Sequence, residues 1–122
     1  MRTFVIGTLL AASALVPMAA SSASAGDSDL GERLRVACLR IPDAQTRVTT
    51  IITRLEAPAD VKGSLAWFRA RIAEATAANH PRIAQDLQHR LDVLVVKLDL
   101  LHHQADRLAA AAAHCRARGV AT

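Results

Sequence analysis

Histidine and aspartate recur in the C-terminal third of the chain, and both residue types bind divalent metals. Asp99, His103 and Asp106 follow one another at i, i+4 and i+7, which places them on one face of a helix. A complete site would need a fourth ligand from elsewhere, such as a second molecule. We favour the alternative, a solvent-facing polar stripe, so the sequence predicts no resident metal or other cofactor.

Cys38 and Cys115 are the only two cysteines. They do not form a CxxC pair, which argues against a redox or metal-binding motif. We predict one intramolecular disulfide between them. An intermolecular disulfide and free thiols are the alternatives.

The sequence contains no recognisable catalytic motif. There is no HExxH, GxSxG, P-loop or dinucleotide fingerprint, so we predict a non-enzymatic protein with no catalytic residues. Of the 15 Lys and Arg residues, Arg2 lies in the first 25 residues, so the rest of the chain has 14 basic residues and 11 Asp and Glu residues. Trp67 and Phe68 are the only aromatic residues of that part, so we expect no nucleic-acid partner.

Residues 1–25 have the three parts of a secretory signal peptide. Arg2 gives a positive start, an apolar stretch follows from Phe4 to Val16, and Ala23-Ser24-Ala25 is a small-x-small cleavage site. The apolar stretch is too short to span a bilayer, and no later segment is apolar for long enough. We therefore predict a cleaved leader, a single domain of residues 26–122, a secreted or extracytoplasmic location, and no stable membrane insertion after cleavage. An uncleaved N-terminal anchor or a buried core helix is the alternative.

The apolar residues recur at helical spacing. From Leu30 to Leu55 they form one stripe at intervals of three and four. Its members are Leu30, Leu34, Ala37, Ile41, Ala44, Val48, Ile51 and Leu55. Pro42 interrupts this stripe, so we expect helices at 29–41 and 42–56, or one kinked helix. A further helix over 64–79 ends at Asn79-His80-Pro81, and a last one covers 81–118.

The last helix carries two rows of apolar residues at heptad spacing. The rows are Leu87, Leu94, Leu101, Leu108 and Cys115, and Ala84, Leu91, Leu98, Ala105 and Ala112. Such a seam is typical of closely packed helices. The sequence therefore predicts an all-α fold: an elongated antiparallel helical hairpin or three-helix bundle with one long C-terminal helix. The segments 29–56 and 64–79 lie end to end along that helix, and the disulfide closes one end.

A second apolar stripe lies roughly opposite this seam. It consists of Val93, Val96 and Leu100, and Trp67 lies beside the stripe of its own helix. Either the 57–63 loop or a bent first segment covers these residues, or they form a contact patch for self-association.

Four arginines also repeat at intervals of seven. They are Arg33, Arg40, Arg47 and Arg54. We favour an edge row that shields the seam with its alkyl stems and pairs with carboxylates. A basic ridge for an anionic surface or partner is the alternative.

One set of features extends over nearly the whole chain beyond the leader: Cys38, Arg40-Ile41-Pro42, Arg47, Arg54, the block from Asp60 to Arg71 with Gly63-Ser64 and Trp67, and Cys115. In these features the chain resembles a group of small secreted helical proteins from high-GC Gram-positive bacteria. The resemblance implies export and a helical fold, and it transfers no activity. Within the block, Asp60 or Ser64 can cap the following helix, and Gly63 permits a tight entry.

We therefore expect an exported, non-enzymatic helical protein that acts by protein contact, either with another copy of itself or with an envelope protein. The alternative is a metal-binding or chaperone-like extracytoplasmic protein.

Cleavage of the leader is directly testable. If residues 1–25 are removed on export, the intact mass of the recovered protein corresponds to residues 26–122 with both cysteines oxidised. A native cytoplasmic form that begins at Met1 and keeps its cysteines reduced would contradict this prediction.

Overall fold

The computed structural model describes residues 22–122, so most of the predicted signal peptide lies outside the described residues. Three helices make up this part of the chain: α1 (Ser22–Leu55), α2 (Leu65–Ala77) and α3 (Pro81–Ala117). The described residues contain no strand. The predicted all-α fold with a long C-terminal helix is therefore confirmed.

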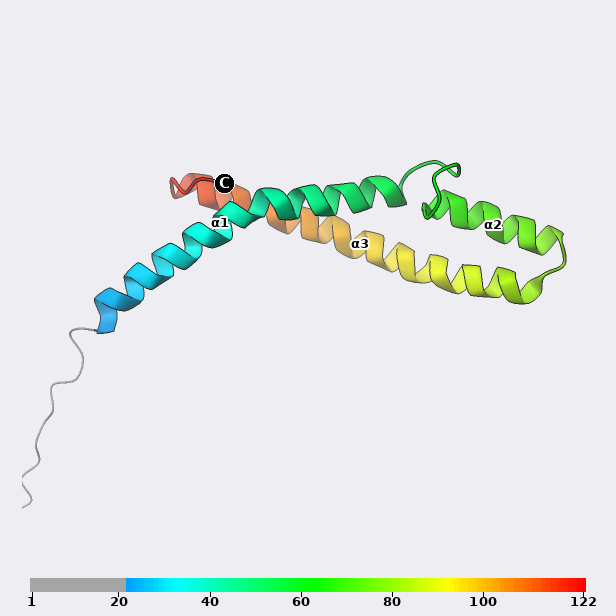
Figure 1. Cartoon of the computed structure of the whole chain (residues 1–122), viewed down its shortest axis with the longest axis horizontal. Coiled ribbons are helices and arrows are strands. Elements are labelled where there is room, and N and C mark those ends of the chain that lie inside the picture. Colours follow the sequence, from blue (N-terminus) through cyan, green and yellow to red (C-terminus); the bar gives the residue numbers. More distant parts are fainter. Residues whose placement is uncertain (1–21) are drawn as a thin grey trace, which may run out of the picture.

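Helix α3 is the long helix against which the other two helices pack. The C-terminal half of α1 and the whole of α2 lie end to end along it (Figure 1), and both pack against α3. The segment between Leu55 and Leu65 falls at the junction of the two shorter arms. This is the predicted elongated hairpin, and the Cys38–Cys115 disulfide closes it at the end far from the α2–α3 turn.

Of the two expected forms, the structure shows the single helix, because α1 continues through Pro42. It begins at Ser22, seven residues before the expected start. Proline removes one backbone donor and crowds the preceding turn, which bends helices. The N-terminal and C-terminal halves of α1 indeed run in different directions (Figure 1). The helix persists because Ile41 and Val48, on either side of Pro42, are both buried against α3.

The N-terminal turns of α1 project beyond the end of α3 (Figure 1) and carry local ion pairs. Asp29 pairs with Arg33, and Glu32 pairs with Arg35, each at 2.9 Å. The hydrogen bond and the positive charge of Arg35 lower the pKa of the Glu32 carboxyl. Both pairs are solvent-exposed, so they contribute little to stability.

The seam of α3 follows the predicted heptads, since all ten residues are buried or half-buried. The seam of α1 contains Leu34, Cys38, Ile41, Gln45, Val48, Ile52 and Leu55. The predicted stripe is thus right at Leu34, Ile41, Val48 and Leu55. It is one residue early at Ala37, Ala44 and Ile51, and it is wrong at Leu30, which is exposed. Ala37 and Ile51 are exposed because the disulfide directs Cys38 toward α3, and Ile52 follows the same register.

The junction between α1 and α2 is fixed by Ser64, whose side chain is fully buried. Its hydroxyl accepts a hydrogen bond from the Trp67 N–H and donates one to the Pro58 carbonyl. Ser64 is therefore the N-cap of α2 and also ties down the preceding loop. Gly63 has a φ of 91°, which favours glycine at this tight entry.

Helices α2 and α3 end in the same way. Asn79 and Gly119 have positive φ, and the next residue donates its N–H to a carbonyl five residues back. The His80 N–H donates to the Ala75 carbonyl, and the Val120 N–H donates to the Cys115 carbonyl. This is the hydrogen-bond pattern of a Schellman cap. The cap of α2 reverses the chain into Pro81, and the cap of α3 packs Val120 against the disulfide cluster.

We predict that the disulfide is the largest single contribution to the stability of the hairpin. It joins residues 77 positions apart, and in the chain-entropy model a loop of this size is worth about 4 kcal/mol. The Cys38→Ser/Cys115→Ser variant should lose that much unfolding free energy in urea titration. Reductant should lower the stability of the wild type by the same amount and leave the variant unchanged. A wild type that is insensitive to reductant would contradict the prediction.

Candidate contact surface

Because α1 and α3 meet along a single seam, the hairpin has two uncovered flanks. We call one the basic flank; its cations are Arg40, Arg47 and Arg54 of α1 and Lys97 and Arg107 of α3. We call the other the acidic flank; its carboxylates are Glu56, Asp92, Asp99 and Asp106. The heptad register separates the two sets, since each set occupies the helix positions on one side of the seam.

Contacts between α1 and α3 identify the side to which each flank belongs. Gln104 of α3 lines a groove together with Arg40 and Arg47 of α1, which marks the basic flank. On the other side, the Nε2 of His102 lies 2.8 Å from the Oε1 of Glu56. Asp99 and Asp106 lie three residues before and four residues after His102, on the same side of α3.

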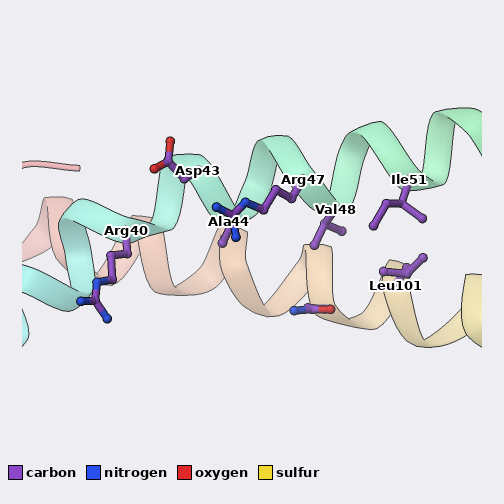
Figure 2. A pocket seen from close by; sticks show the side chains of 8 residues that line it. Arg40, Asp43, Ala44, Arg47, Val48, Ile51 and Leu101 are labelled. Atoms are coloured by element: carbon purple, nitrogen blue, oxygen red, sulfur yellow. The ribbon is translucent and has the colours of Figure 1, made fainter.

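The groove on the basic flank lies between α1 and α3 and has a volume of about 600 Å³. Its lining comprises Arg40, Asp43, Ala44, Arg47, Val48, Ile51, Leu101 and Gln104. Val48 and Ile51 point toward Leu101, whereas Asp43 points away from α3 (Figure 2). The groove therefore has an apolar floor and a cationic edge.

A second hollow adjoins this groove along α3. It is lined by Leu100, His103, Gln104, Arg107, Leu108 and Ala111. Gln104 lines both hollows, so they lie next to each other on the same flank. The cationic and apolar lining thus extends from α1 onto α3.

The arginines that line the groove have no protein partner within residues 22–122. The structure shows no ion pair or side-chain hydrogen bond for Arg40 or Arg47, and the same holds for Arg107. Their neighbours in the predicted row differ: Arg33 pairs with Asp29, and the Nη2 of Arg54 donates to the Lys62 carbonyl at 3.4 Å. Among the four arginines of the predicted row, only Arg33 therefore makes the expected ion pair with a carboxylate of the described residues.

The predicted metal ligands are only partly brought together. His103 Nε2 lies 3.7 Å from Asp99 Oδ2, on the exposed surface of α3. Among the described residues, no group of three His, Cys, Asp or Glu side chains is placed to hold a metal ion. The side chains of Asp99, His103 and Asp106 are exposed to solvent on α3.

The predicted contact patch divides into two parts. Val93, Val96 and Leu100 are between 57% and 62% exposed, so neither the junction loop nor the bent α1 covers them. Trp67 of α2 is half-buried: its ring makes an edge contact with Phe68, and the Arg71 guanidinium lies over it at 5.4 Å. It lines a separate hollow between α2 and the start of α3.

Sequence reasoning did not identify the groove. It placed Ala44 and Ile51 in the seam, whereas both line the groove beside it, and it assigned no role to Gln104. The signal was Cys38 itself, because a disulfide to α3 requires Cys38 in the seam. That requirement moves Ala44 and Ile51 to the flank.

Comparisons with protein-family models, curated proteins and solved structures find no match to this chain. Within residues 22–122, no helix has the length and hydropathy needed to cross a bilayer. The suspected relationship to secreted proteins therefore stays a prediction. The interpretation of this surface rests on its own geometry.

Two adjacent leucines distinguish the core from the contact surface. Leu101 is 7% exposed and packs in the seam with Val48 and Leu55, whereas Leu100 is 62% exposed. We expect Leu101→Ala to lower the unfolding free energy by about 2–4 kcal/mol, and Leu100→Ala to change it by less than about 0.5 kcal/mol. Chemical denaturation of both variants tests this. Equal losses would contradict the assigned orientation of α3.

Proposed function

We propose that this protein is exported and works without catalysis, by binding a helix of another protein molecule along its basic flank. The disulfide supports an oxidising location, since such bonds persist mainly outside the cytoplasm. The open shape of the hairpin supports a contact role, since it leaves both flanks available.

The observation that carries the proposal is the groove between α1 and α3. Its floor is apolar, its arginines have no partner in the described chain, and it runs between two helices. A third helix that packs there would cover Ala44 and Ile51 and complete a three-helix arrangement. Carboxylates along the edge of that helix would pair with Arg40 and Arg47. This charge pairing would make the groove selective for a partner helix with an acidic edge.

A contact role also fits the chemistry of the lining better than catalysis does. Asp43 is the single carboxylate of the groove, and it points away from α3 (Figure 2). The groove has no histidine, cysteine or hydroxyl side chain that Asp43 could activate.

A labelled helical peptide with a Leu/Ala stripe and Glu along both edges is the appropriate probe. We expect this peptide to bind the oxidised protein. We expect it to bind the Arg40→Glu/Arg47→Glu variant at least about tenfold more weakly, because the attraction of each arginine for the glutamates of the peptide becomes a repulsion. Fluorescence anisotropy measures the Kd. The matched control, Arg69→Glu/Arg82→Glu, makes the same change in net charge at exposed residues away from the groove and should bind as the wild type does.

Several outcomes would contradict the proposal. Equal binding of a peptide with Lys in place of Glu would remove the charge selectivity. Binding to vesicles of anionic phospholipid without binding to either peptide would indicate a membrane-surface role. Suppression of aggregation of an unfolded client, with no preference between the peptides, would support the chaperone-like alternative through Val93, Val96 and Leu100.

A further inference from the structure

We infer that the helix that occupies the basic flank is α3 of a second copy of this chain, which presents its acidic flank. The inference rests on the proposed function, because it names the partner of the same groove. It predicts head-to-tail self-assembly through two different flanks of the hairpin.

The first argument is the spacing of the charges. Arg40, Arg47 and Arg54 recur every seven residues on α1, and Asp92, Asp99 and Asp106 recur every seven residues on α3. At 1.5 Å per residue, neighbouring charges in both rows are about 10.5 Å apart along the helix. A row of three cations can therefore meet a row of three anions of the same period along its whole length.

The second argument is that the two rows lie on opposite flanks. The Glu56–His102 contact joins α1 and α3 on the acidic side, and the arginine-lined groove lies on the other. One molecule therefore cannot pair its own rows. Two copies that met through the same flank would place like charges against each other, which is unfavourable. Pairing of unlike flanks is the complementary arrangement.

Both flanks also expose apolar side chains that such a contact would cover. On the basic flank these are Ile51 and Leu100, which are 39% and 62% exposed. On the acidic flank they are Leu39 and Val95, which are 50% and 43% exposed. The apolar residues supply affinity, and the charged rows fix which flanks meet.

A contact between two different flanks leaves one flank free at each end of the pair. Such heterologous contacts extend into rings or open filaments and do not stop at a dimer. The expected product is therefore a series of species larger than a dimer, formed at low salt from the oxidised protein.

Charge-reversed variants test the inference by complementation. Arg40→Glu/Arg47→Glu reverses two of the five cations of the basic flank, and Asp99→Arg/Asp106→Arg reverses two of the four carboxylates of the acidic flank. All four side chains are exposed, and circular dichroism melting checks that both variants keep the fold. In sedimentation velocity, each variant alone should associate at least about tenfold more weakly than the wild type, whereas their equimolar mixture should regain association. Arg69→Glu/Arg82→Glu should behave as the wild type does.

The outcomes separate this inference from the proposed function. A wild type that stays monomeric at high concentration and low salt, but binds the acidic peptide, would overturn self-assembly and leave the helix-binding role intact. A stable dimer that either reversed variant retains would overturn the pairing of unlike flanks. Failure of the mixture to associate, with both variants folded, would overturn the pairing of these rows. Loss of both peptide binding and self-association would reject the proposed function as well.

Discussion

The register of α1 against α3 is set by the Cys38–Cys115 disulfide, and the other features of the hairpin depend on that register. The bond holds the two Cα atoms 6.0 Å apart, which requires Cys38 to face α3. Ile41, Val48 and Leu55 then follow in the seam, and Pro42 is left on the exposed side of α1. A small core of this kind benefits from such a covalent constraint, because two packed helices bury little apolar area.

A single seam between two helices separates the remaining surface into two sides. Since Arg40, Arg47 and Arg54 share one heptad position and Asp92, Asp99 and Asp106 share another, the two rows of charges lie on opposite sides of the α1–α3 seam. The same arrangement gives the α1–α3 part of the hairpin two long, unlike surfaces. The proposed association with a helix rests on these two surfaces.

The helical rows of α3 were readable from the sequence because heptad spacing is a local property of one helix. The Ser64 cap and the Asn79 turn were readable for the same reason, since capping involves residues close together in the chain. The choice between two segments and one kinked helix at Pro42 was not readable, because it depends on Ile41 and Val48, which are buried against α3 on either side of the proline.

By itself, the sequence determined the all-α class, and it favoured the antiparallel order of the helices and the pairing of Cys38 with Cys115 over the alternatives. Each follows from spacing, turn residues or the cysteine count. Only the tertiary structure decided which side of α1 faces α3, and with it that Ala44 and Ile51 line a groove whose edge carries Arg40 and Arg47, which pair with no side chain between residues 22 and 122. Positions 37 and 38 are both compatible with an apolar stripe, so the choice depends on the contact with another helix and not on the local pattern.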